Sequence, residues 1–203
     1  MTAIKTVGVI GSGQMGNGIA HVAALAGFHV ILNDVSEDRL KSAMATINGN
    51  LSRQVARKTI TEDAHKKALA RISSSDTLDG LAACDLVIET AVEKEDIKRK
   101  IFHDLCAVLK PEAIIASNSS SISITRLAAS TDRPERFIGI HFMNPVPVME
   151  LVELIRGIAT DDKTFDAART FVTKLGKQIA VSEDFPAFIV NRILLPMINE
   201  AIY

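Results

Sequence analysis

Apolar residues recur along the chain in two alternating patterns. Short runs that are almost continuously apolar, such as residues 6–10 and 85–89, are typical of strands buried on both faces. Longer stretches between them repeat apolar residues every three or four positions, as Ile97, Ile101 and Leu105 do, and this spacing predicts amphipathic helices. Strands that alternate with helices indicate a doubly wound α/β fold, in which a mostly parallel sheet carries helices on both faces.

A glycine-rich turn follows the first predicted strand. Its residues are Gly11, Ser12, Gly13, Gln14, Met15 and Gly16. Glycine allows a tight turn at position 11, leaves room for a pyrophosphate at position 13 and lets the following helix pack closely at position 16. A second apolar strand ends in Asp34, whose carboxylate is suited to bind the hydroxyls of an adenosine ribose. This order predicts a Rossmann-type dinucleotide site, and the charge of Asp34 favours NAD over NADP.

Two helices are predicted after the second strand, over residues 36–55 and, more briefly, over residues 61–71. Ser36 and Thr61 are suited to cap these helices at their N-termini. The two helices are longer than a crossover between strands requires, so we expect a helical hairpin that projects from the sheet. Basic residues at its outer positions, such as Arg57, allow two interpretations: a solvated helix face, or a contact with the phosphates of a substrate.

A histidine and a glutamate interrupt two later apolar strands. One strand ends in His141, and after a proline-containing turn the chain returns as a strand in which Glu153 has apolar neighbours. A carboxylate buried there needs a hydrogen-bonded partner, and His141 is the nearest candidate. Such a carboxylate fixes the tautomer of the imidazole and leaves its other nitrogen free to act as a base. Because parallel strands end at one edge of a sheet, this edge should also gather residues 11–16, Asp34, Glu93 and residues 117–121.

The composition limits the possible partners. The chain has 203 residues and a formal net charge of −1, so neither nucleic acid nor a membrane surface is expected as a partner. Cys84 and Cys106 lack the spacing of metal ligands; we expect no metal site and two reduced thiols, as in a cytoplasmic protein. No apolar run is long enough to cross a bilayer.

The last predicted helix spans residues 187–203 and is mostly apolar. Pro196 is expected to interrupt it, and no cap or closing glycine ends it. A helix of this kind needs partners that few remaining residues could supply. We therefore expect the front portion of a longer protein, with a dinucleotide-binding domain at residues 1–185.

Four segments carry a resemblance to a known family. They read GSGQMG at residues 11–16, ASNSSSISI at 116–124, HFMNPVPVMELVE at 141–153 and PAFIVNRIL at 186–194. In these segments the chain resembles the bacterial short-chain 3-hydroxyacyl-CoA dehydrogenases, and the resemblance extends over essentially all residues. It implies NAD as the cofactor and reversible oxidation of a 3-hydroxyacyl-CoA to the 3-ketoacyl-CoA. It also implies a homodimer formed through a following all-helical domain, of which residues 186–203 are the first helix.

The same resemblance implies roles for individual residues. The implied catalytic residues are His141 as the base, Glu153 as its acidic partner, and Ser120 and Asn191 as polar groups at the substrate oxygen. The implied cofactor site comprises residues 11–16, Asp34, Glu93, Lys98, Ser120 and Asn144. The implied contacts with the CoA substrate are Asn50, Arg57 and Ser120, of which the first two touch its CoA portion. The family commonly has serine and lysine at the first two of these positions, so the chain departs there, although Arg57 keeps a positive charge suited to phosphates.

Other interpretations of the same residues stay open at this point. Dehydrogenases that act on free 3-hydroxyacids share the glycine turn but typically use a catalytic lysine on a later helix. A non-catalytic NAD-binding or structural relative would not need the intact set of His141, Glu153, Ser120 and Asn191. A glycine-rich turn can also occur in an unrelated α/β protein.

Overall fold

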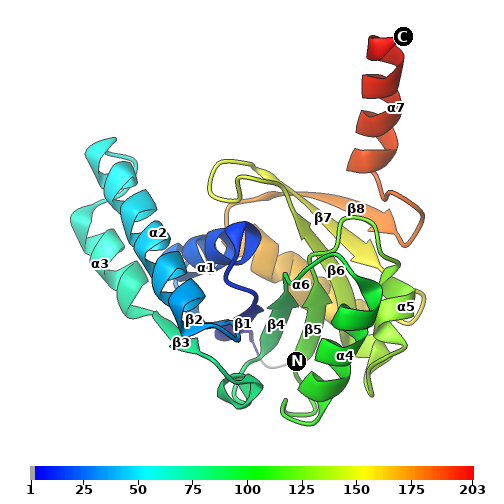
Figure 1. The fold of residues 1–203 in the computed structure, drawn as a ribbon, viewed down its shortest axis with the longest axis horizontal. Coiled ribbons are helices and arrows are strands. Elements are labelled where there is room, and N and C mark those ends of the chain that lie inside the picture. The colour runs from blue at the N-terminus through cyan, green and yellow to red at the C-terminus, as the bar shows by residue number, and fades with distance from the viewer. Residues whose placement is uncertain (1–2) are drawn as a thin grey trace.

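The computed structural model describes residues 3–203. Its centre is an eight-stranded sheet with the order β3-β2-β1-β4-β5-β6-β7-β8 (Figure 1). The strands are β1 (Thr6–Ile10), β2 (His29–Asn33), β3 (Ile72–Ser75), β4 (Leu86–Glu89), β5 (Ile114–Ser117), β6 (Phe137–Phe142), β7 (Leu151–Arg156) and β8 (Gln178–Glu183). Neighbouring strands are parallel, apart from the antiparallel pair β6 and β7. The predicted mostly parallel sheet is confirmed, and the order from β3 to β6 is that of a Rossmann-type domain.

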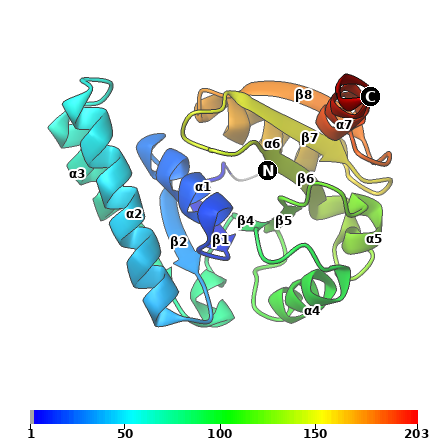
Figure 2. The same cartoon turned by 45° about the horizontal axis from the view of Figure 1, so that its top comes forward.

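Helices connect most of these strands. They are α1 (Gln14–Leu25), α2 (Glu37–Ala56), α3 (Glu62–Ala70), α4 (Glu95–Cys106), α5 (Ile124–Ala128), α6 (Asp162–Lys174) and α7 (Val190–Ile202), with short 3₁₀ turns at Leu78–Leu81 and Pro134–Arg136. On one face of the sheet, Ala23 of α1 and Phe171 of α6 belong to a buried apolar cluster. On the other face, Phe102 of α4 and Leu127 of α5 belong to a second cluster. Helices therefore cover both faces, as predicted, and Figure 2 shows α4 beside α5.

The helical hairpin is confirmed. Helices α2 and α3 lie side by side against α1 and extend beyond the sheet (Figures 1 and 2). Ser36 caps α2 by accepting a hydrogen bond from the N–H of Arg39, and Thr61 caps α3 by accepting one from Ala64. These caps satisfy N–H groups that have no partner inside the helix, so both helices begin where the sequence predicts.

The apolar spacing predicts the buried face of α4 only in part. Ile97 was expected to point inward, but 42% of its surface is exposed. Leu105 is buried as predicted, and the other buried residues of α4 are Lys98 and Phe102. This rotation of the helix has an electrostatic reason, because the Lys98 ammonium meets buried carboxylates at the edge of the sheet.

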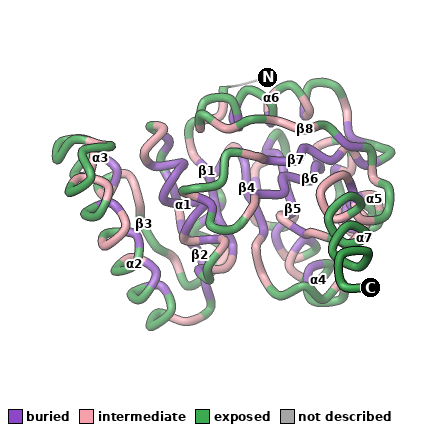
Figure 3. The backbone as a smooth tube through the Cα atoms, turned by 90° about the horizontal axis from the view of Figure 1, so that it is seen from above, coloured by how far each residue is buried: buried purple, intermediate pink, exposed green. Residues whose placement is uncertain are grey.

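Helix α7 stands away from the sheet and is exposed from Arg192 onward (Figures 1 and 3). It begins at Val190, later than predicted, because Ala187 and Phe188 adopt left-handed φ angles of 68° and 48° that turn the chain before the helix starts. The predicted interruption at Pro196 is wrong, since the helix continues through it. The exposed apolar residues of α7 include Ile193, Leu195, Met197, Ile198 and Ile202.

Candidate active site

The antiparallel pair of β6 and β7 brings His141 and Glu153 together. The two residues are direct partners in the strand register. Nδ1 of His141 lies 2.7 Å from Oε2 of Glu153, and both side chains are buried. The predicted contact between this histidine and this glutamate is confirmed.

Glu153 is held on its other side by the start of α7. Its Oε1 accepts hydrogen bonds from the main-chain N–H groups of Ile189 at 2.9 Å and Val190 at 2.8 Å. Burial raises the pKa of Glu153, but the hydrogen bonds from His141 and from these two N–H groups outweigh burial and lower the pKa below its ordinary value. An ionised Glu153 accepts the Nδ1 proton of His141, so the Nε2 atom of a neutral His141 carries the free lone pair.

A cavity of about 370 Å³ lies in front of His141. Its walls include Met15, Glu93, Lys98, Ser120, His141, Asn144 and Asn191. Asn191 of α7 reaches across to the loop after β5, where its Nδ2 donates to the carbonyl oxygen of Ser120 at 3.1 Å. The structure therefore gathers the predicted catalytic residues around one cavity, with Glu153 directly behind His141.

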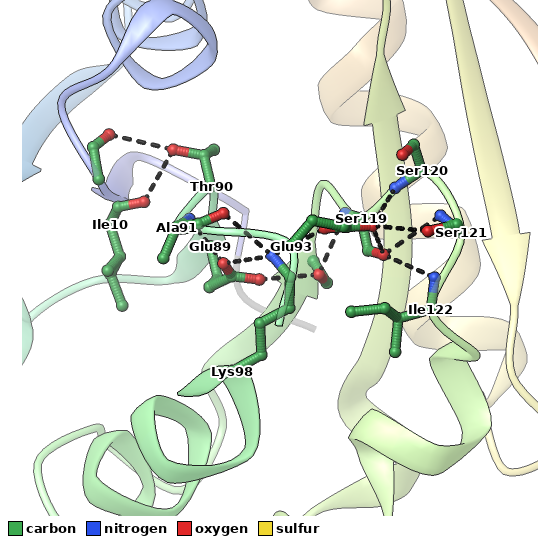
Figure 4. A network of polar contacts seen from close by, with 12 residues as sticks. Ile10, Glu89, Thr90, Ala91, Glu93, Lys98, Ser119, Ser120, Ser121 and Ile122 are labelled. Carbon is green, nitrogen blue, oxygen red and sulfur yellow. Dashed lines mark hydrogen bonds and ion pairs between the residues drawn. The ribbon is translucent and has the colours of Figure 1, made fainter. Parts of the chain in front are cut away.

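Glu93 holds the serine loop, which consists of Ser119 to Ser121 after β5, at the rim of this cavity (Figure 4). Its Oε1 accepts hydrogen bonds from the hydroxyl of Ser119 at 2.5 Å, from the N–H of Ser120 at 3.0 Å and from the hydroxyl of Ser121 at 3.1 Å. Burial raises the pKa of Glu93, but the Ser119 hydrogen bond and the nearby Lys98 ammonium outweigh burial and lower it. Glu93 is therefore an ionised anchor for the loop as well as a wall of the cavity.

Lys98 lines the same cavity, but its ammonium group is already engaged. Its side chain is 1% exposed, and Nζ lies 2.7 Å from Oε1 of Glu89 and 3.3 Å from Oε2 of Glu93. Sequence analysis did not identify Glu89, the last residue of β4, which is fully buried. The available signal was an acid at the end of an otherwise apolar strand, which is the same signal that identified Asp34.

The glycine-rich turn has the geometry predicted for it. Gly11 has a φ of +91°, which side-chain-bearing residues rarely adopt. A Cβ at Gly16 would lie 1.7 Å from the carbonyl oxygen of Gly11, so only glycine allows α1 to approach the turn this closely. A Cβ at Gly13 would meet no atom of residues 3–203 within 4 Å, and Gly13 supplies no side-chain cap to α1. The N-terminus of α1 therefore faces open space, where an anion can approach its N–H groups.

Asp34 lies beside this turn, at the end of β2. Its Oδ2 accepts hydrogen bonds from the N–H and the hydroxyl of Ser12, both at 2.9 Å, and its Oδ1 accepts one from the N–H of Ser36 at 3.2 Å. Sequence analysis missed a cation nearby: Nη1 of Arg39 lies 3.9 Å from Oδ1 of Asp34. Because Arg39 is 73% exposed, its charge is also available to a ligand at this edge.

A second cavity, of about 490 Å³, lies between the start of α1, the inner side of α2 and the turn at residues 144–147. Asn50 of α2 lines it, together with Arg39 and Asn144. Asn50 also accepts a hydrogen bond from Arg53. Arg57 lies at the C-cap of α2, about two helical turns beyond Asn50. Asn144 lines both cavities, so the two spaces meet at this residue.

Metal-ligand clusters and membrane-spanning helices are both absent from residues 3–203. No three histidine, cysteine, aspartate or glutamate residues in this range are grouped so that they could hold a metal ion. Within the same range, no helix combines the length and the apolar character that a membrane span requires. Cys84 and Cys106 are free thiols, and burial raises the pKa of Cys84 to about 12, which makes it a poor nucleophile.

Residues 6–185 match the family described as the NAD-binding domain of 3-hydroxyacyl-CoA dehydrogenase. The chain belongs to the 3-hydroxyacyl-CoA dehydrogenase family. The 3-hydroxybutyryl-CoA dehydrogenase of Bradyrhizobium diazoefficiens is 82% identical to this chain, over 98% of this chain and 68% of the relative. The probable 3-hydroxybutyryl-CoA dehydrogenase of Deinococcus radiodurans is 48% identical, over 96% of this chain and 70% of the relative. The crystal structure of (S)-3-hydroxybutyryl-CoA dehydrogenase from Ralstonia eutropha matches with a TM-score of 0.96 and 49% identity, over 98% of this chain and 70% of that one.

NAD is the cofactor of this 3-hydroxyacyl-CoA dehydrogenase domain, as predicted. The residues present fit it, because a Cβ at Gly13 would enter the open space in front of α1. Beside the glycine-rich turn, Asp34 provides a buried carboxylate. A carboxylate at the end of β2 suits ribose hydroxyls and repels a 2′-phosphate. The individual cofactor and substrate contacts of these residues stay predictions.

Proposed function

We propose that this dehydrogenase interconverts 3-hydroxybutyryl-CoA and acetoacetyl-CoA, with His141 as the base in oxidation and as the acid in reduction. The observation that carries this proposal is the 2.7 Å contact between His141 Nδ1 and Glu153 Oε2 at the wall of the 370 Å³ cavity. The substrate follows from the names of the relatives that are 82% and 49% identical to this chain.

In the oxidation, Nε2 of His141 takes the proton of the substrate's 3-hydroxyl group. Glu153 stabilises the resulting imidazolium, because its carboxylate is ionised and bonded to Nδ1. Ser120 and Asn191 lie in the wall of the same cavity and donate hydrogen bonds to the substrate oxygen as its charge changes. NAD, when bound, supplies the acceptor for the hydride that leaves carbon 3.

The remaining residues bind the two ligands. The glycine turn and Asp34 hold the adenosine and pyrophosphate portion of NAD, while Glu93, Lys98, Ser120 and Asn144 line its nicotinamide portion. The acyl-CoA reaches the cavity from the side of α2, where Asn50 and Arg57 contact its CoA portion and Ser120 contacts its acyl end. Arg57 supplies a positive charge for a CoA phosphate.

Residues 186–203 open an all-helical domain that closes the cavity and forms a homodimer, in a cytoplasmic enzyme. The support is the exposed apolar surface of α7, on which Ile193 is 62% and Ile202 is 73% exposed. Asn191 lies on the same helix and already reaches Ser120, so the helix contributes to the site. The free thiols of Cys84 and Cys106 suit a reducing compartment.

The test is an NADH oxidation assay with the full-length enzyme, with acetoacetyl-CoA and free acetoacetate as substrates. We expect turnover of acetoacetyl-CoA, little turnover of the free acid, and a collapse of activity in His141→Gln. Equal turnover of free acetoacetate would instead assign the enzyme to the dehydrogenases that act on free 3-hydroxyacids. NADH binding without turnover of either substrate would favour a non-catalytic relative.

A further inference from the structure

Glu89 occupies a position that the proposed reaction does not use directly. It ends β4, is 0% exposed and is separated from the 370 Å³ cavity by the residues bonded to it. Both oxygens of its carboxylate are engaged. Oε1 accepts from Nζ of Lys98 at 2.7 Å and from the N–H of Ala91 at 2.6 Å (Figure 4). Oε2 accepts from the hydroxyl of Ser117 at 2.8 Å.

The first oxygen reaches the serine loop through two charged residues. Lys98 lies between Glu89 and Glu93, at 2.7 Å from one carboxylate and 3.3 Å from the other. Glu93 in turn accepts hydrogen bonds from Ser119, Ser120 and Ser121. A displacement of the Lys98 ammonium would therefore move the carboxylate that holds this loop.

The second oxygen reaches the same loop by a separate route. The hydroxyl of Ser117, which donates to Glu89, accepts a hydrogen bond from the N–H of Ser119 at 3.2 Å. The hydroxyl of Ser119 then accepts from the N–H of Ile122 at 2.9 Å. The two routes from one buried carboxylate thus meet at Ser119.

The loop connects these contacts to the site. The carbonyl oxygen of Ser120 accepts the hydrogen bond from Asn191, and both residues line the cavity. We propose that Glu89 is a positioning residue for the reaction, which holds the loop of Ser119 to Ser121 so that Ser120 and Asn191 face the substrate oxygen. This inference rests on the proposed function.

A role in stability alone is a poor explanation for these contacts. A buried ion pair loses much of its favourable energy to desolvation, so an apolar pair of similar volume would stabilise a core equally well. An ion pair with hydrogen bonds in several fixed directions instead defines the orientation of the groups around it.

The test uses the full-length enzyme with Glu89→Gln and the matched control Asp85→Asn. The glutamine side chain would keep the shape of the glutamate, remove its charge and place an NH₂ group where an acceptor is needed. Asp85 precedes the other end of β4 and also pairs with a lysine, Lys110, but it bonds to the N–H groups of Lys5 and Thr6, outside the serine loop.

In Glu89→Gln we expect kcat to fall about tenfold, with the KM for acetoacetyl-CoA and the affinity for NADH changed less than about twofold. Hydrogen exchange of a peptide covering residues 117–123 should become faster. In Asp85→Asn both kcat and this exchange should match the parent. An unchanged kcat, an unchanged exchange rate or an equal loss of kcat in the control would each overturn the proposal.

A second variant keeps the test valid if Glu89→Gln does not fold. Ser117→Ala removes one of the two routes without changing any charge. It should lower kcat about threefold and make hydrogen exchange of residues 117–123 faster. Retained kcat in Ser117→Ala would then overturn the proposal. The exchange measurement also separates this inference from the proposed function: if the parent enzyme does not reduce acetoacetyl-CoA, the proposed function fails, while the exchange of residues 117–123 still shows whether Glu89 orders the loop.

Discussion

Two carboxylates, Glu153 and Glu89, lie in similar surroundings but have different partners. Both are fully buried in the sheet, and each lies 2.7 Å from a basic side chain. Glu153 is bonded to His141, and imidazoles are the side chains that most often transfer protons in enzymes. Glu89 is bonded to Lys98, whose Nζ donates to Glu89 and to the carbonyl oxygen of Ala91. The difference separates a pair that can move a proton from a pair that can only hold a position.

The pKa values of the two carboxyl groups shift in opposite directions. At Glu153 burial raises the pKa, but the hydrogen bonds from His141, Val190 and Ile189 outweigh it, and the pKa falls below its ordinary value. At Glu89 burial prevails over Lys98 and Ser117, and the pKa lies above its ordinary value. Glu153 is therefore the better stabilised anion of the two, which suits a group that must balance the charge of an imidazolium.

The comparison is tested most strongly at His141. In His141→Gln of the full-length enzyme, kcat should fall by about 10²–10⁴, because the group that transfers the proton is lost. NADH affinity, measured by fluorescence titration, should change little. An unaffected kcat would remove His141 from the mechanism and with it the distinction between the two pairs.

Glu153→Gln should lower kcat by about 10²-fold, at the lower end of that range. The main-chain N–H groups of Ile189 and Val190 require an acceptor, so the amide oxygen turns toward them and the NH₂ group faces His141. Nδ1 then becomes the acceptor and Nε2 carries the proton, which is the wrong tautomer for a base.

Nitrogen NMR of the His141 ring in this variant would report the tautomer directly. Glu150→Gln is the matched control, because Glu150 is an exposed glutamate next to the same strand. A Glu153→Gln enzyme that keeps its activity, or the original tautomer, would show that the carboxylate does not orient the imidazole.

Asp34 extends the comparison to a carboxylate that binds hydroxyl and N–H donors. Asp34→Ala should raise the ratio of NADP to NAD use, measured as kcat/KM, by about tenfold, because the repulsion of a 2′-phosphate is removed while Arg39 stays close. Ser12→Ala is the control, since it removes one donor to Asp34 and leaves its charge. Equal use of NAD and NADP by the parent enzyme would contradict the role of Asp34.

How far the sequence predicts these carboxylates depends on what surrounds each one. Glu153 and His141 were found because both lie in apolar strands joined by a short turn, so a partner was available nearby. Lys98 was placed at the site, but Ile97 was expected to be the buried residue of that turn of α4. An analysis of apolar spacing treats every lysine as exposed. It therefore cannot predict that Lys98 is buried because it pairs with Glu89 on β4.

The start of α7 shows a second limit of the sequence. The left-handed φ angles of Ala187 and Phe188 are rare for residues with side chains, so no local signal predicts them. The tertiary contacts provide a reason: Phe188 is 6% exposed in the core, and the N–H groups that follow it bind Glu153. The bend that orients α7 toward the site is therefore a product of packing, whereas the sheet and the hairpin follow from local pattern.

Asp184 gives the smallest expected effect, because its carboxylate holds only a helix end. It accepts hydrogen bonds from the hydroxyl of Ser123 at 2.6 Å and from the N–H groups of Ile124 at 2.9 Å and Thr125 at 2.8 Å. Burial raises its pKa, but these bonds outweigh burial and lower it. Asp184→Asn should cost about 1–2 kcal/mol of unfolding free energy in urea at pH 7, with NADH affinity unchanged.

A lowered pKa in the folded state means that the ionised form stabilises the fold. This contribution is complete above the ordinary pKa of 3.8 and is lost as the pH falls through the lower value of the folded state. The difference between parent and Asp184→Asn should therefore be constant from pH 7 to pH 5 and shrink below about pH 3.8. Asp162→Asn is the control, since this aspartate is 87% exposed and its ion pair with Arg156 contributes little. A difference that grows on acidification would show that Asp184 is not stabilised as an anion, and that its hydrogen bonds do not outweigh its burial.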